Sequence, residues 1–347
     1  MSDAPDPVSI LARVDAASVT PAVAQALRAG AVVAQVPAGI FDLVGSGALA
    51  CMQGLLTNDI EKPGDGALAY GALLTPKGMI VADGWVGRRG ELVRFTTSAE
   101  GRERAALIFQ RSIPPRLANT ADRSADLRVV RLSGPAALGI AEAARLLIPH
   151  APGRVELEGD LEVGRASVGA PFTVQWIGTP PALESLSQRL VAKGAVVGDP
   201  AALELARIEA GWPSLASEVD DKTLPQEVRY DEIGGVSYTK GCYTGQETVS
   251  RVHFRGHPNR GLRGVQLASE PPVEWRTAQP VHLSDKEVGH LTSVAWIPDG
   301  SPESRGGVWM GLAILRREVA DGAAVRVGMI EAKVTPLPLP LPRFEPA

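Results

Sequence analysis

Cysteine is nearly absent from this chain of 347 residues, which contains only Cys51 and Cys242. Two cysteines so far apart in sequence provide neither a disulfide framework nor the paired spacing of a zinc site. Aromatic residues make up only 5% of the chain. No apolar run approaches the ~18–20 residues of a membrane-spanning helix, and the basic and apolar segments of a signal peptide are missing. We therefore expect a cytoplasmic protein with reduced thiols and no membrane partner.

Runs of one charge sign are missing as well. The chain has 35 lysine and arginine residues against 39 aspartate and glutamate residues, which gives a net charge of -4. Because no basic stretch stands out, we expect no direct nucleic-acid partner. The glycine fingerprint of a dinucleotide-binding fold and a phosphate-binding loop are also absent, so nothing supports a nicotinamide or flavin oxidoreductase.

The chain is rich in apolar residues, which make up 45% of a length that exceeds one ordinary core. We predict an α+β protein with two ferredoxin-like (split βαβ) units, over residues 31–123 and 124–258. Only short, strand-like segments separated by turns follow, so residues 259–340 are predicted to form an antiparallel β-barrel. The ends, residues 1–10 and 341–347, are predicted to be loose tails.

A short internal similarity suggests that the two α+β units are copies of one another. When Gly45 is aligned with Gly134, the Ala-Leu pair that begins three residues later also coincides. Each glycine follows a predicted strand and precedes a predicted helix, and two strands and a further helix come after it in the same order. The alternative is that small residues recur at strand-to-helix turns for local reasons alone.

The glycine-rich stretch before the barrel carries the most unusual local pattern. Gly235–Tyr238 alternates apolar and polar residues, which predicts a short strand, and Thr244 and Glu247 have the spacing of a helix capping box. Cys242 lies two residues before this cap and close to Lys240, where the helix dipole and the ammonium would favour a thiolate. A small buried cysteine is the alternative, but the polar surroundings favour an accessible, reactive thiol.

The same stretch, Lys-Gly-Cys-Tyr-Thr-Gly-Gln-Glu at 240–247 followed by Arg251, resembles the signature of the YgfZ family. These are folate-binding proteins similar in fold to the glycine-cleavage T-protein, an aminomethyltransferase. Shorter similarities occur in the family's order at residues 55–59, 74–78, 207–213 and 225–227.

This resemblance implies that the three predicted units surround a central folate tunnel. It also implies a role in the assembly or repair of iron–sulfur clusters, with effects on tRNA modification. The implied cofactor is tetrahydrofolate or a one-carbon derivative, and the implied partners are iron–sulfur proteins or assembly factors, with a transient cluster contact. We expect a monomer. The residues expected at the reactive thiol site are Cys242, Lys240, Gln246 and Glu247. Those expected to bind folate are Glu227, Arg251, Tyr243, Asp83, Asn58 and Arg260.

The chemistry of folate indicates which residue types should hold it. A pterin ring presents an N–H beside an amino group, and one carboxylate can accept from both. Glu227 matches the family's pterin-gripping glutamate and is the first choice, with a solvated loop carboxylate as the alternative. The anionic tail of folate would need Arg251 or Arg260, although Arg251 could instead pair with Glu247 on the same helix.

One position departs from the aminomethyltransferases, which carry two adjacent aspartates after the glycine turn, one of them catalytic. This chain has Ala82 followed by Asp83, so we do not expect a working aminomethyltransferase, although Asp83 could still bind the pterin. Aminomethyl transfer or demethylation remains the first alternative function, and a folate-binding scaffold without thiol chemistry is the second. The four-residue spacing of His253 and His257 is not expected to form a metal site, because glycine and proline interrupt that segment.

Overall fold

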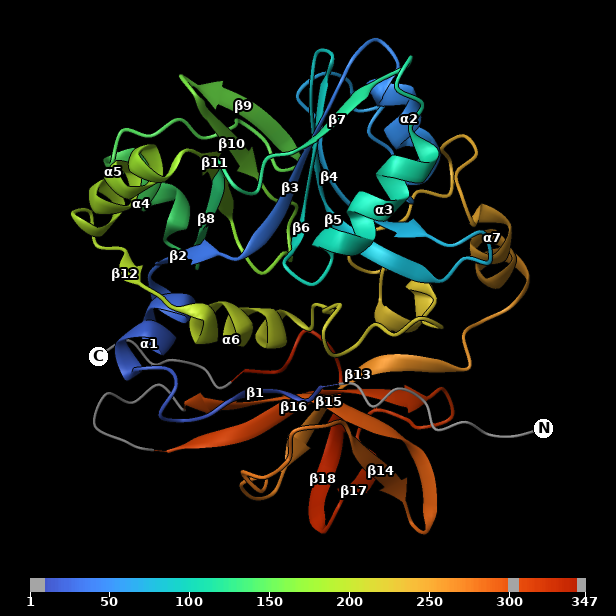
Figure 1. The fold of residues 1–347 in the computed structure, drawn as a ribbon. Helices are drawn as coiled ribbons and strands as arrows, with labels where there is room; N and C mark the ends of the chain where they lie inside the picture. Colours follow the sequence, from blue (N-terminus) through green and yellow to red (C-terminus); the bar gives the residue numbers. More distant parts are fainter. Residues whose placement is uncertain (1–9, 299–305, 342–347) are drawn as a thin grey trace.

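A computed structural model describes residues 10–298 and 306–341, and their strands form three sheets (Figure 1). The predicted tails fall almost wholly outside these residues. Two of the sheets carry helices on their outer sides, and the third closes into a barrel beneath them. None of the helices in the described part of the chain is both long and apolar enough to cross a membrane.

The first α+β unit has a five-stranded sheet in the order β4-β5-β6-β3-β7. Helices α2 and α3 cover one face of it, where Phe109 of α3 meets Phe41 and Phe95 edge to face at 5.4 and 5.5 Å between ring centroids. The elements are β3 (Ala38–Val44), α2 (Ala48–Leu55), β4 (Leu68–Leu74), β5 (Ile80–Arg89), β6 (Leu92–Ser98), α3 (Arg102–Ser112) and β7 (Asn119–Asp122).

The second α+β unit has a six-stranded sheet in the order β12-β2-β8-β11-β10-β9. Its core contains the fully buried Trp176 and the apolar face of α5, with Leu183, Leu186 and Leu190 buried. The elements are β2 (Val32–Val36), β8 (Arg128–Ser133), α4 (Ala137–Ala143), β9 (Arg154–Glu158), β10 (Leu161–Arg165), β11 (Val174–Gly178), α5 (Pro180–Val191) and β12 (Val196–Val197). Strand β2, which the predicted boundaries group with the first unit, pairs in this second sheet.

The two units repeat the same order of elements, β-α-β-β-β-α-β, and the same order of strands across the sheet. They differ in that β2 is inserted between β8 and β12. Gly45 and Gly134 occupy equivalent strand-to-helix turns with φ of 143° and 116°, where backbone also approaches closely. A Cβ atom on Gly134 would lie 2.5 Å from the carbonyl oxygen of Gly30. The fold thus supports the internal duplication, and both glycines are required by geometry.

The predicted barrel is confirmed. Six antiparallel strands form a closed ring, because β15 pairs with both β14 and β16. The short strand β1 (Ala12–Val14) adds in parallel to β15 from outside. The barrel strands are β13 (Arg260–Leu267), β14 (Gln279–Leu283), β15 (Lys286–Pro298), β16 (Gly307–Arg316), β17 (Ala324–Val327) and β18 (Ile330–Thr335).

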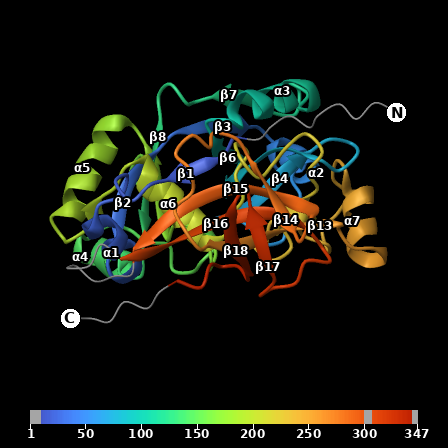
Figure 2. The ribbon, with the colours of Figure 1, turned by 90° about the horizontal axis from the view of Figure 1, so that it is seen from below.

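Helix α6 (Pro200–Ala210) lies between the α+β units and the barrel, and the view from below shows the barrel strands crossing beneath it (Figure 2). It starts where Asp199 accepts a hydrogen bond from the amide of Ala202, with proline at the first turn, and ends at Gly211 in the left-handed conformation. The remaining helices are α1 (Pro21–Ala29), the 3₁₀ helix η1 (Pro225–Val228) and α7 (Gln246–Arg255).

A buried ion-pair network joins the two α+β units. Glu162 of the second sheet accepts from Arg89 at 2.7 Å and from Arg94 at 3.3 Å, both of the first sheet. Arg94 also donates to Asp42 at 2.6 Å on a neighbouring strand. Because each buried charge has an opposite partner, the network fixes how the two sheets face one another.

Two local predictions in the stretch before the barrel are wrong. Gly235–Tyr238 is not a strand, because its backbone bonds to the loop after α2: Ser237 donates to the carbonyl of Thr57, and the Thr57 hydroxyl donates to the carbonyl of Gly235. The capping box at Thr244 and Glu247 does not form either. Helix α7 instead begins after Gly245, which takes a left-handed φ of 82° that offers no side-chain cap.

Candidate functional site

Cys242 is exposed and lies in the loop that leads into α7, and Figure 1 shows α7 at the edge of the molecule beside the first unit. The predicted accessibility of this thiol is therefore confirmed. Cys51, on α2, is only partly exposed, and burial raises the pKa of its thiol. Cys242 is therefore the more exposed of the two thiols, while its chemical role stays a prediction.

Lys240 anchors this loop to the end of α2. Its ammonium donates to the carbonyl oxygens of Gln53, Leu56 and Asn58 at 2.7, 2.6 and 2.8 Å, and it lies 5.2 Å from the ring centroid of Tyr243. Burial lowers the pKa of Lys240 to about 8. A cation at a helix C-terminus satisfies carbonyls that have no partner within the helix. Lys240 therefore sets the position of the segment that presents Cys242.

We expect Lys240→Ala to lower the free energy of unfolding by about 1–3 kcal/mol, because it leaves buried carbonyls without a donor. Urea unfolding of the variant beside wild type measures this difference. Lys77→Ala is the matched control, since Lys77 is exposed in a nearby turn. Equal stability of the two variants would show that the three carbonyl contacts of Lys240 contribute nothing to the fold.

The other residues predicted for this region lie at different depths. The Asn58 side chain donates to the carbonyls of Gly234 and Tyr70, at 2.7 Å each, so it ties the loop after α2 to two other segments. Tyr243 is buried, and its hydroxyl has no partner among the described residues. The remaining three belong to α7: Gln246 begins the helix, and Glu247 and Arg251 are exposed on it.

Glu227, the predicted pterin ligand, forms an ion pair with Arg260. Arg260 donates to its two carboxylate oxygens at 3.0 and 3.2 Å, and the amide of Leu224 donates to Oε2 at 3.0 Å. The structure therefore brings two predicted folate residues together, but as partners of one another. A pterin bound to Glu227 would have to displace Arg260.

His253 and His257 do not share a helix face. Helix α7 ends at Arg255, and His253 stacks on Tyr238 with 3.6 Å between ring centroids. Within the described ranges, no group of three His, Cys, Asp or Glu side chains is arranged to hold a metal ion.

A cavity of about 370 Å³ is lined by the inner faces of both α+β sheets, α6 and the segment after it. Its polar lining includes Asp83 from β5, Arg131 from β8 and Arg207 from α6, and Trp85 and Trp212 contribute aromatic walls. Of the residues predicted for folate, only Asp83 lines this cavity.

Asp83 is the buried acceptor in the cavity wall. Its Oδ2 atom accepts from the hydroxyls of Tyr70 at 2.7 Å and Tyr230 at 2.5 Å. Burial raises the pKa of Asp83, although these two hydrogen bonds act in the opposite direction. Ala82 faces the opposite side of the strand, in the core under α2 and α3. A carboxylate at position 82, which this chain lacks, would therefore lie on the core side of the sheet. The carboxylate of Asp83, which it keeps, faces the cavity.

Aromatic side chains surround this carboxylate. The ring of Tyr70 lies 4.8 Å from Trp212 and 5.4 Å from Trp85, between centroids, and Trp85 lies nearly parallel to Trp212 at 6.2 Å. Trp85 also contacts Phe172 at 5.1 Å. Flat apolar walls beside one buried acceptor suit a planar heterocycle that carries hydrogen-bond donors.

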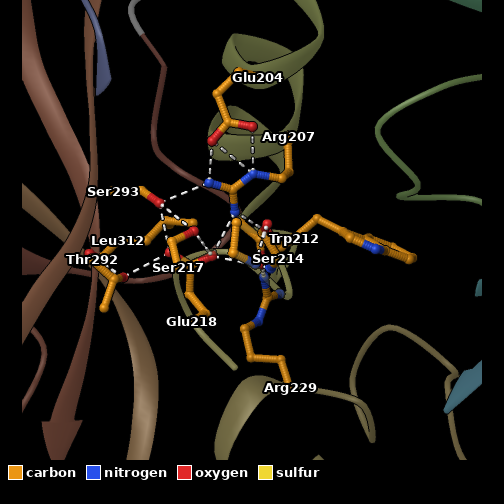
Figure 3. A network of polar contacts seen from close by, with 12 residues as sticks. Glu204, Arg207, Trp212, Ser214, Ser217, Glu218, Arg229, Thr292, Ser293 and Leu312 are labelled. Carbon is orange, nitrogen blue, oxygen red and sulfur yellow. Dashed lines mark hydrogen bonds and ion pairs between the residues drawn. The ribbon is translucent and has the colours of Figure 1, made fainter. Parts of the chain in front are cut away.

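The wall formed by α6 is held in place by the fully buried carboxylate of Glu218 (Figure 3). Its Oε2 accepts from Arg207 at 2.8 Å and from Ser217 at 2.9 Å, and its Oε1 accepts from Thr292 at 2.7 Å and Ser293 at 2.5 Å. These bonds join α6, the loop after it and barrel strand β15. Glu218 therefore positions Arg207 and Ser217, which both line the cavity.

The residues of the cavity region that sequence reasoning missed include Arg131, Tyr70 and Tyr230. One weak signal exists for Arg131, which lies mid-strand at a position whose alternate neighbours are buried. The sequence gives no such signal for the two tyrosines, because their role depends on both hydroxyls reaching Asp83 in the folded chain.

Comparison with known proteins shows which sequences and structures this chain resembles. The family model described as the GCVT N-terminal domain matches residues 16–146. An aminomethyltransferase of Rubrobacter xylanophilus is 28% identical over 327 residues, 87% of this chain and 82% of that protein. The tRNA-modifying protein YgfZ of Sodalis glossinidius is 27% identical over 307 residues, 86% of this chain and 90% of that protein.

Among solved structures, the glycine cleavage system aminomethyltransferase T from Bartonella henselae superposes with a TM-score of 0.76. The match covers 93% of this chain and 90% of that one at 19% sequence identity. The fold expected from the signature is confirmed.

Proposed function

The chain is a YgfZ- and GcvT-like protein, and we propose that it binds a reduced folate in the cavity lined by Asp83. The observation that carries this proposal is the buried Asp83 carboxylate among aromatic walls. The hydroxyls of Tyr70 and Tyr230 both donate to Oδ2 of Asp83. Within the described part of the chain, no side chain donates to its Oδ1. The paired donors of a pterin would complete this acceptor, and the aromatic walls that contain Trp85 and Trp212 would lie beside the ring.

We further propose that the protein acts in the assembly or repair of iron–sulfur clusters, with effects on tRNA modification. Relatives named as tRNA-modifying protein YgfZ support the link to tRNA modification. The exposed Cys242 supports it too, because a thiolate is a soft ligand for iron–sulfur clusters and must be reachable by the partner that carries one. In this proposal the cluster is cargo, and folate occupies a separate cavity.

Asp83→Asn is expected to weaken tetrahydrofolate binding roughly 10- to 100-fold, because an amide cannot accept charge-assisted bonds from the pterin donors. Isothermal titration calorimetry with tetrahydrofolate measures the change. Asp160→Asn is the control, since Asp160 is exposed at a turn.

The pH dependence of binding adds a second measurement to that experiment. The acceptor is lost as Asp83 becomes protonated, and burial raises its pKa. Wild-type affinity should therefore fall on acidification at a higher pH than an exposed aspartate would give, and Asp83→Asn should lose this dependence. Unchanged affinity in Asp83→Asn would remove Asp83 from the ligand site.

The remaining predicted folate residues stay as proposals with a different test. If Glu227→Gln weakened tetrahydrofolate binding while leaving the fold intact, the pterin would have to bind at the Glu227–Arg260 pair. Tyr243, Asn58 and Arg251 would then become the neighbouring contacts to examine. Loss of stability without loss of affinity would assign Glu227 to the fold, as its ion pair with Arg260 suggests.

Aminomethyl transfer is the second candidate. Asp83 faces the cavity, although Ala82 stands where the aminomethyltransferases have a second aspartate. One relative is also named an aminomethyltransferase. Purified protein can be mixed with tetrahydrofolate and an aminomethyl-loaded lipoyl carrier. Release of ammonia at about 1 per second or faster would place this activity first.

A further inference from the structure

Arg131 is a cation without an anionic partner in the cavity wall. It lies in the middle of the second sheet, where β8 is flanked by β2 and β11, and its guanidinium sits 4.1 Å above the ring of Phe172. Its Nε atom is buried with no hydrogen-bond partner. Within the described residues, no ion pair reaches Arg131, and desolvation lowers its pKa to about 10. A desolvated charge without a counter-ion is costly, so the part of the cavity beside Arg131 is suited to receive an anion. The acidic residues that also line the cavity are Asp83, Glu100 and Glu204.

The lining that Arg131 shares with Asp83 indicates what kind of molecule would supply that anion. Aromatic rings in contact with one another lead from one to the other, since Phe172 lies 5.1 Å from Trp85 and Trp85 lies 5.4 Å from Tyr70, whose hydroxyl bonds to Asp83. The cavity wall therefore combines a hydrogen-bond acceptor, aromatic rings and a cation. A ligand that carries hydrogen-bond donors, an aromatic part and a carboxylate would match this combination.

We propose that Arg131 binds a carboxylate of the glutamate part of the bound folate. This inference rests on the proposed folate function and assigns the anion-binding residue of the same cavity. The two arginines that the sequence suggested are placed less favourably, because Arg251 is exposed on α7 and Arg260 already holds Glu227. Arginine also has the forked geometry that a carboxylate accepts in a bidentate manner.

The test compares tetrahydrofolate with its dimethyl ester, in which both glutamate carboxylates are neutral. Wild type should bind tetrahydrofolate roughly 10- to 100-fold more tightly than the ester, and Arg131→Gln should bind the two equally. Arg128→Gln is the matched control on the same strand. Arg128 points to the opposite face of the sheet, where it donates to the carbonyls of Ser124 and Leu127. This control should keep the wild-type preference.

Each other outcome would overturn the assignment. Equal loss of affinity for both ligands in Arg131→Gln would mean that Arg131 only shapes the cavity. A retained preference for tetrahydrofolate would place the carboxylate elsewhere. If wild type bound both ligands equally, the folate function would stand and the Arg131 subsite would fall. If wild type bound neither, the folate function itself would fail, and the subsite with it. Should Arg131→Gln not fold, Arg131→Lys decides, since losing the two-pronged contact should still reduce the preference.

Discussion

Glu218→Ala is expected to lower the free energy of unfolding by about 3–5 kcal/mol, the range found when one partner of a buried ion pair is removed. The variant would remove one of the two carboxylates that pair with Arg207, which keeps Glu204, and would take an acceptor from the hydroxyls of Thr292 and Ser293. Because these groups come from α6 and the barrel, their contact should loosen first. The cavity wall that contains Arg207 should lose its shape at the same time.

Urea unfolding followed by circular dichroism measures this effect. Glu142→Ala is the control, because Glu142 is exposed on α4, and it should change stability by less than about 0.5 kcal/mol. Glu218→Gln keeps the volume and part of the hydrogen bonding, so its cost should fall between the two. A loss below about 1 kcal/mol in Glu218→Ala would show that water or rearranged side chains replace the carboxylate.

Cys242→Ser is expected to abolish cellular function while leaving the fold and tetrahydrofolate affinity unchanged. A serine hydroxyl fills nearly the same space but does not ionise near neutral pH and is a poor ligand for a soft metal. Because Cys242 is exposed and lies outside the cavity lining, stability should change by less than about 0.5 kcal/mol. Complementation of cells that lack their own YgfZ, with tRNA modification and iron–sulfur enzyme activity as readouts, measures the loss.

Cys51→Ser is the matched control and should complement fully. In native protein, alkylation followed by peptide mass spectrometry should modify Cys242 before Cys51, because Cys51 is partly shielded and burial raises its pKa. Full complementation by Cys242→Ser would remove the thiol from the mechanism. The protein would then be a folate-binding scaffold.

Local pattern was sufficient for much of the fold. The barrel strands were predictable, because each alternates between a packed barrel interior and solvent and is bounded by turn residues. The two equivalent glycines were predictable as turn positions, since few other residues adopt φ of 143° or 116°. The same reasoning failed at Gly235–Tyr238, where alternation was present but the hydrogen-bond partner was Thr57, remote in sequence.

From the signature stretch, the sequence alone predicted an exposed thiol at Cys242, because its glycines and charges favour an accessible cysteine over a buried one. The sequence could not show which acidic residues bind a ligand and which support the fold. Glu218 and Glu227 lie in one acidic segment, residues 214–230. In the structure, Glu218 is buried between α6 and β15, whereas Glu227 pairs with Arg260.

The cavity is a property of tertiary structure. Asp83 and Arg131 lie on different sheets, and only the packing of the two duplicated units directs both into one space. Local sequence sets which face of a strand a side chain occupies, but not what lies opposite that face. Burial and the partner across the gap decide whether a carboxylate or a guanidinium is a solvated surface group, half of an ion pair, or a site that waits for a ligand.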